Sequence, residues 1–131
     1  MRSFNRVLMF AGLVLTVFAA GCTIAPIYNV PNAPVSTSKP NANLDDVGKA
    51  IVRAGTALGW NMQVTKPGQI LGTLNLRSHE AIVDVNYSQT SYSINYKDSK
   101  NLNYDGTNIH KNYNGWIQNL DRGIKAQLSL L

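Results

Sequence analysis

The chain has 131 residues, of which 44% are hydrophobic and 15% charged, and its formal net charge is +5. This length provides one domain with one core, and the single cysteine excludes an intrachain disulfide. Because the basic residues are scattered with no run among them, the clustered basic face of a nucleic-acid-binding protein is not expected.

The first 22 residues contain the parts of a secretory signal. Arg2 and Arg6 precede an uncharged, apolar stretch over residues 7–20, and small residues come before the lone Cys22. A basic start, a short apolar region and a small-residue cleavage site make up such a signal. The apolar run is shorter than the roughly 20 residues that a membrane-spanning helix needs, so we expect cleavage rather than a span.

The residues Ala19-Ala20-Gly21-Cys22 resemble the lipobox of bacterial lipoproteins. The resemblance implies cleavage after Gly21, a diacylglyceryl group on the sulfur of Cys22 and an acylated new amino terminus. Ala19 departs from the family pattern, in which leucine is commoner. Thr23 stands where an aspartate would favour the inner membrane, so the resemblance implies a lipid-anchored outer-membrane protein facing the periplasm. Two or three acyl chains make a long-lived anchor, because one myristoyl chain binds only marginally.

Residues 22–43 predict a lipidated cysteine followed by a tether. Between Thr23 and Asn43, four prolines recur among Asn, Ser, Thr and Ala without helical or strand periodicity. Such a segment buries too little apolar surface to offset its ordering entropy. We expect a semi-extended spacer with an apolar patch near the lipid, formed by Ile24, Ile27 and Tyr28.

A helix over residues 44–58 is predicted to open the folded domain, which spans residues 44–131. Asn43 is a good N-cap, and apolar residues recur at helical spacing up to a stop at Gly59. Gly48 and Gly55 lie seven residues apart, near one face of this helix. Because interior glycine costs about 1 kcal/mol relative to alanine, the pair indicates close approach to a sheet or contact with a partner helix.

Four stretches of alternating apolar and polar residues predict four strands. Short connections between them, such as Pro67-Gly68, predict an antiparallel meander with one buried and one polar face. A last helix follows from the spacing of apolar residues between Ile109 and Leu128. The expected fold is a two-layer α+β domain of order α-β-β-β-β-α, with both helices on one face of the sheet. The predicted strands cover residues 60–65, 70–77, 81–88 and 91–97.

No catalytic constellation is evident, so we expect no enzyme, no cofactor and no metal. Neither His79 nor His110 has a second histidine or a cysteine at metal-ligand spacing. Glu80 and Asp84 share one face of a strand, but they flank Ile82 on the face expected to be solvated. Paired carboxylates there do not indicate a glycosidase site.

Aromatic and amide side chains near the sheet and the last helix form the predicted binding surface. Tyrosine offers a large rigid area with a polar tip. Tyr92, Tyr96 and Tyr113 are expected to pack in the core or at its edge, and Gly115 indicates either binding or close packing. The residues assigned to the binding surface are Tyr87, Tyr104, His110, Asn112 and Asn114.

These features together predict a membrane-anchored periplasmic lipoprotein with a non-enzymatic binding or envelope-assembly role. The lipid on Cys22 is expected to hold the protein at the membrane. The expected partner is an envelope protein or a cell-wall component. The alternative is a module on the same anchor that binds, or inhibits by binding, a glycan or small ligand. Nucleic acid is not an expected partner.

Overall fold

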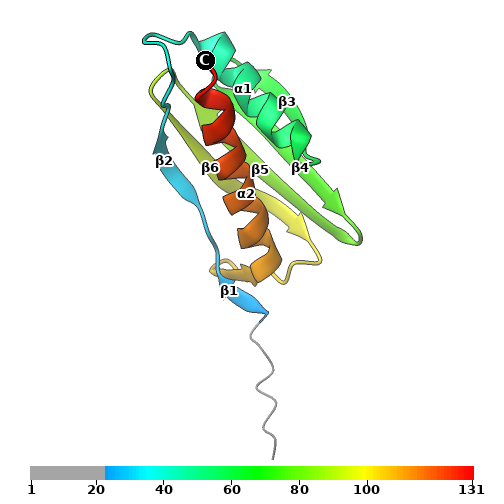
Figure 1. Cartoon of the computed structure of the whole chain (residues 1–131). Helices are drawn as coiled ribbons and strands as arrows, with labels where there is room; N and C mark the ends of the chain where they lie inside the picture. The colour runs from blue at the N-terminus through cyan, green and yellow to red at the C-terminus, as the bar shows by residue number, and fades with distance from the viewer. Residues whose placement is uncertain (1–22) are drawn as a thin grey trace, which may run out of the picture.

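The computed structural model describes residues 23–131 (Figure 1). The predicted signal over residues 1–21 and the predicted lipidation of Cys22 lie outside these residues. Within the described chain, seven strands and two helices follow one another. They are β1 (Ile24–Pro26), β2 (Val30–Pro34), α1 (Leu44–Ala57), β3 (Asn61–Lys66), β4 (Gln69–Leu76), β5 (His79–Tyr87), β6 (Ser91–Lys100), β7 (Asn108–His110) and α2 (Lys111–Leu128).

The fold is α+β, as predicted. A five-stranded antiparallel sheet has the order β2-β6-β5-β4-β3, and β1 pairs with β7 in a separate two-stranded sheet. Both helices lie over the same face of the larger sheet (Figure 1). Alternation along β5 shows why: Ala81, Val83 and Val85 are fully buried, whereas Asp84 and Asn86 point to the other face.

The predicted four-stranded meander is incomplete, because β2 adds a fifth strand alongside β6. Val30 pairs with Ile94 and Ala33 pairs with Tyr92, with an irregular register between the two pairs. This bulge places Val30 and Ala33, three residues apart, on the same buried face. The two-residue alternation that identifies a strand is therefore absent from this part of the sequence.

The predicted tether over residues 22–43, with its domain boundary at Asn43, is wrong for the described part of that segment. The domain already includes β1 and β2, and the chain after β2 also contacts the fold. The amide of Val35 donates to the carbonyl of Thr90 at 2.9 Å, and that of Lys39 donates to the carbonyl of Leu131 at 3.1 Å. Prolines are compatible with this placement because β2 is an edge strand.

The last helix also begins later than predicted. Ile109 belongs to β7, where it pairs with Ala25 and is fully buried, and α2 starts at Lys111. His110 is the N-cap, since its ring Nδ1 accepts from the amide of Asn112 at 3.2 Å. A buried isoleucine fits both a helix and a strand, so spacing alone did not separate them.

The two helices pack against each other in opposite directions above the sheet. Arg53 of α1 donates to the side chain of Gln127 near the end of α2, at 3.2 Å. A buried polar contact links α2 to the sheet: the Tyr92 hydroxyl donates to Asp121 Oδ1 at 2.5 Å, and Lys125 Nζ lies 2.8 Å from Asp121 Oδ2. Burial, followed by the hydrogen bond to Asp121, raises the pKa of Tyr92.

Candidate functional site

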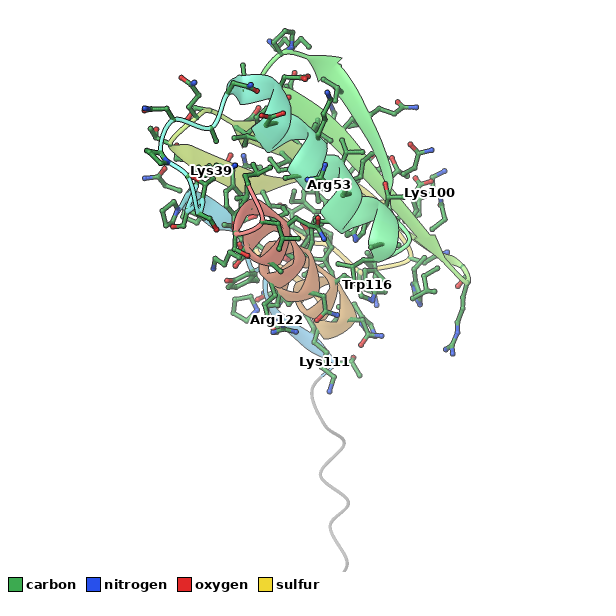
Figure 2. The ribbon with its side chains drawn as sticks, turned by 45° about the horizontal axis from the view of Figure 1, so that its top comes forward. Lys39, Arg53, Lys100, Lys111, Trp116 and Arg122 are labelled. Carbon is green, nitrogen blue, oxygen red and sulfur yellow. The ribbon has the colours of Figure 1, made fainter. Side chains whose placement is uncertain are left out.

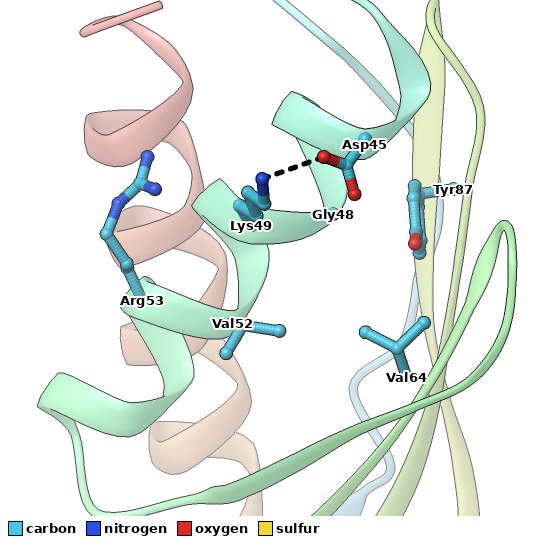
Figure 3. A pocket seen from close by; sticks show the side chains of 7 residues that line it. All are labelled: Asp45, Gly48, Lys49, Val52, Arg53, Val64 and Tyr87. Atoms are coloured by element: carbon cyan, nitrogen blue, oxygen red, sulfur yellow. Dashed lines mark ion pairs between the residues drawn. The ribbon is translucent and has the colours of Figure 1, made fainter.

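A groove opens between α1 and the edge strand β3 (Figure 3). It has a volume of about 480 Å³ and adjoins a second hollow of about 430 Å³ at the start of α1. Val64 of β3 is 55% exposed and faces the groove. We call this feature the α1–β3 groove; its lining residues are Asp45, Gly48, Lys49, Val52, Arg53, Val64 and Tyr87.

Gly48 allows Tyr87 to lie against α1 inside this groove. A Cβ on Gly48 would come within 2.5 Å of the Tyr87 hydroxyl oxygen and 2.9 Å of its Cζ. About two turns further on, a Cβ on Gly55 would come within 2.5 Å of the sulfur of Met62 in β3. The prediction that these glycines serve close approach to the sheet is therefore confirmed.

The rim of the groove is charged, with a surplus of cations. Lys49 Nζ lies 2.8 Å from Asp45 Oδ2, and this contact raises the pKa of Lys49. Both side chains are largely exposed, so the pair adds little stability. Lys66, beside the second hollow, has no ion pair within the described residues. Arg53 turns toward α2, where its Nε donates to Gln127 (Figure 3). An acidic group entering the groove would therefore meet uncompensated positive charge.

Strand β3 is the more accessible edge of the five-stranded sheet. The opposite edge, β2, contains Pro31 and Pro34, which lack the N–H that pairing needs. No proline occurs in β3 between Asn61 and Lys66, and most of its side chains are exposed. The main-chain groups on its outer side are therefore suited to pair with an added strand.

The predicted binding residues do not form one surface. Tyr87 lies in the α1–β3 groove, beside the first turns of α1. Tyr104 packs on Tyr96, with ring centroids 4.0 Å apart, and its hydroxyl donates to the carbonyl of Gly106 at 3.3 Å. His110 caps α2, as described above. Only Tyr87 among these three belongs to the groove.

Asn112 and Asn114 also lie at the start of α2. Asn112 is exposed. The side chain of Asn114 holds the segment after β1: its Nδ2 donates to the carbonyl of Pro26 at 2.9 Å, and its Oδ1 accepts from the amide of Tyr28 at 2.8 Å. Asn114 therefore has a structural task that its position in the sequence does not indicate.

The structure brings together two histidines that are distant in the sequence. The rings of His79 and His110 have centroids 6.0 Å apart, and the ring of Trp116 lies 6.3 Å from that of His79. His79 Nδ1 donates to the carbonyl of Asn101 at 2.7 Å. Two histidines are fewer than a zinc site needs, and residues 23–131 contain no cluster of three or more potential metal ligands.

A smaller, polar hollow of about 280 Å³ lies beside the turn between β5 and β6. Its lining includes the amides of Asn32 and Asn86 and the hydroxyls of Ser91 and Ser93, beside Tyr87 and Tyr92. Such groups can exchange hydrogen bonds with sugar hydroxyls. Sequence reasoning missed this hollow because Asn32 stood in the expected tether.

Comparison with known proteins finds no matching family model, no matching curated protein and no matching solved structure. The helices within residues 23–131 are too short or too polar to cross a membrane.

Proposed function

We propose that this chain is a lipid-anchored protein of the bacterial cell envelope that binds an extended segment of another envelope protein and catalyses no reaction. The observation that carries the binding role is an open strand edge, β3, beside an apolar groove. The anchor rests on the resemblance of residues 19–22 to a lipobox, with the domain on the periplasmic side of the outer membrane.

An extended segment suits this site because β3 can supply the hydrogen bonds and the groove can supply the specificity. In strand addition, main-chain pairing at a sheet edge gives affinity, and pockets for alternate side chains select the sequence. Val52 and Val64 face each other across the groove, with Tyr87 beside them (Figure 3). An apolar side chain of the added strand would be buried among these three.

The positive charge beside the groove further limits which segments we expect to bind. Lys66 borders the second hollow and has no ion pair within the described residues. Opposite charge across an interface favours the correct partner and speeds its encounter. The expected segment therefore combines apolar residues with at least one acidic residue.

The anchor is tested by replacing Cys22 with serine. The variant is expected to lose its acyl groups by intact mass and to leave the detergent phase in phase separation, because no other residue carries the lipid. Normal detergent partitioning with an unchanged mature mass would contradict the lipoprotein assignment.

The binding site is tested by photocrosslinking in intact cells. A photoreactive residue at Lys49, on the rim, is expected to give one defined adduct whose mass-mapped site lies in an extended segment of an envelope protein. Val64→Asp should abolish the adduct, because it places a charge on the apolar side of the groove. Gln63→Asp adds the same charge on the other face of β3 and should preserve it. An adduct unaffected by Val64→Asp would overturn this site.

The polar hollow beside β5 and β6 favours a second candidate, the glycan- or small-ligand-binding module. Its amide and hydroxyl lining suits a sugar better than an apolar peptide. Titration with soluble peptidoglycan fragments, followed by backbone NMR, distinguishes the two. Saturable shifts at Asn86 and Ser93 would support the glycan, whereas no shift there at millimolar ligand would exclude it.

A further inference from the structure

We infer that the end of the domain formed by the start of α2 and the β4–β5 turn rests on the headgroups of the anchoring bilayer, so that the α1–β3 groove faces away from the membrane. This inference rests on the proposed lipidation of Cys22. A flexible tether would let the domain stand away from the membrane in any orientation. The inferred contact instead fixes the orientation of the domain on the membrane.

β1 is attached to the domain at both of its ends. The carbonyl of Thr23 accepts from the amide of Lys111 at 2.8 Å, and Ile24 pairs with His110 in β7. Asn114 then holds both Pro26 and Tyr28. The described chain is therefore bonded to the domain from Thr23 onward, and no slack remains between Thr23 and the start of α2.

Covalent geometry limits the distance between the proposed anchor and β1. Consecutive Cα atoms across a trans peptide are about 3.8 Å apart, so Cys22 cannot lie further than that from Thr23. The polar zone on each side of the hydrocarbon core is only about 5–8 Å thick. With its acyl chains in the bilayer, Cys22 therefore holds the start of α2 at the level of the headgroups.

The surface at this end of the domain carries exposed cations and apolar side chains. Lys111 and Arg77 are exposed cations without an ion pair among the described residues, and Leu76 beside Arg77 is 46% exposed. The half-buried Trp116 lies one to two turns into α2, and Figure 2 shows it with Lys111 far from Lys39. Cations and amphipathic aromatic rings are the groups that suit an anionic membrane surface.

Contacts between elements place the β4–β5 turn at this same end. His79, just after the turn, lies 6.0 Å from His110 and 6.3 Å from Trp116, measured between ring centroids. Asn101 also joins the turn to the end of β6, because its side chain donates to the carbonyl of Ser78 at 2.6 Å. Glu80, a carboxylate nearby, is paired with Lys100 at 3.7 Å.

The orientation also decides where the groove lies. The 18 residues of α2 rise about 27 Å, and α1 runs antiparallel to α2, with its first turns beside the far end of that helix. A partner segment would therefore meet the α1–β3 groove a few tens of ångströms above the bilayer, in the periplasmic space.

The test compares two matched variants of the full lipidated chain, Ser78→Cys and Ser36→Cys. Ser78 lies in the β4–β5 turn, and Ser36 lies at the opposite end; both are exposed. Once Cys22 is a thioether, the introduced cysteine is the sole free thiol and takes a fluorophore. The protein is placed in vesicles of phosphatidylethanolamine and phosphatidylglycerol that carry a nitroxide on some headgroups.

Strong quenching of the label at residue 78, with little quenching at residue 36, is the expected result. Lys111→Glu should reduce the quenching at residue 78, whereas Lys39→Glu, an equal charge change at the opposite end, should not. Equal quenching at both sites, or no effect of Lys111→Glu, would overturn the inference. Intact mass separates the two proposals: missing acyl groups contradict the anchor, whereas an acylated but unquenched Ser78→Cys protein contradicts only the orientation.

Discussion

Gly115 shows how a single residue can be assigned once its surroundings are known. It lies inside α2, and a Cβ placed on it would meet no atom within 4 Å. The close-packing explanation for this glycine is therefore wrong. Gly115→Ala is expected to raise the free energy of unfolding by about 1 kcal/mol, because alanine removes the cost of interior glycine. Urea denaturation measures the change.

Gly48→Ala is the matched comparison, since it has the same gain in helix propensity but a collision with Tyr87. Overpacking costs about 1–3 kcal/mol, so this variant should be less stable than Gly115→Ala by that amount. An equal gain in both variants would mean that Tyr87 does not lie against Gly48.

The environment of Tyr92 also allows a change in the free energy of unfolding to be predicted. Its hydroxyl donates to the buried carboxylate of Asp121, and losing such a bond costs about 1–3 kcal/mol. Tyr92→Phe should therefore lower the free energy of unfolding by this amount near neutral pH. Tyr104→Phe removes a longer, exposed hydrogen bond and should change it by less than about 0.5 kcal/mol.

The same contact makes stability depend on pH in the alkaline range. Burial and the bond to Asp121 raise the pKa of Tyr92 above its ordinary value of 10.0. The stabilisation from this contact is complete below the ordinary pKa of tyrosine and declines as the pH rises above it. The reason is that the unfolded chain then releases a proton that the folded chain keeps. Between about pH 8 and about pH 11, the thermal midpoint of Tyr92→Phe should fall less than that of the unchanged protein. An equal fall would contradict this assignment.

At the scale of elements, one side chain of α2 adds to the pairing that holds β1 against β7. Asn114→Ala removes the bonds to Pro26 and Tyr28, each worth about 0.5–1.5 kcal/mol. Hydrogen exchange at the amides of Tyr28 and Lys111 should accelerate about tenfold or more, because local opening becomes easier.

Asn112→Ala serves as the control, since Asn112 is exposed and only its backbone amide takes part in capping α2. Exchange at Tyr28 should be unchanged in this variant. Slow exchange at Tyr28 in Asn114→Ala would show that β1 is held by its pairing with β7 alone.

The helices and the meander could be predicted because their signals are local. Asn43 caps α1 as expected, with its side chain accepting from the amide of Asp46 at 2.8 Å. Gly68 adopts a φ of 86°, as the Pro67-Gly68 turn requires. In both cases the residues that form the contact are near neighbours in the chain, so a short window of sequence contains the whole signal.

The candidate site could be predicted only in part. The sequence assigns Tyr87 to the binding surface as a strand tyrosine with a rigid, polar-tipped side chain, and Tyr87 lines the groove. Val64, Val52 and the rim cations were missed, because periodicity assigned Val64 to an ordinary apolar position of a strand and gave Val52 no role. The groove lies beside the point where Gly55 and Met62 bring α1 and β3 together. It is a property of packing between elements.

At the scale of the whole molecule, the segment between β2 and α1 becomes part of the fold. Deleting residues 36–41 removes the bond from Lys39 to Leu131 and the bond from Ser38 to the carbonyl of Ser129. The thermal midpoint should fall by about 4–8 °C or more, since each kcal/mol corresponds to a shift of that size in a domain near this length.

Replacing the same six residues with a glycine–serine segment of equal length removes their side-chain contacts but keeps the length of the connection. The comparison with the deletion therefore separates these two effects on stability. This variant should lose less stability than the deletion, because β2 and α1 remain free to reach their positions. A deletion with an unchanged midpoint would restore the interpretation of this segment as a spacer.

The sequence by itself determined the α+β class, both helices and the alternating strands from β3 to β6, since these depend on periods of two and 3.6 residues. Tertiary structure alone decided that β1 and β2 join the domain. Those strands are short and rich in proline, and their pairing partners β7 and β6 lie far along the chain. β2 is held by pairing with β6, and β1 by pairing with β7 and by Asn114. These contacts join residues far apart in the chain, so no local sequence pattern indicates them. The same contacts set the distance between the predicted anchor and the domain.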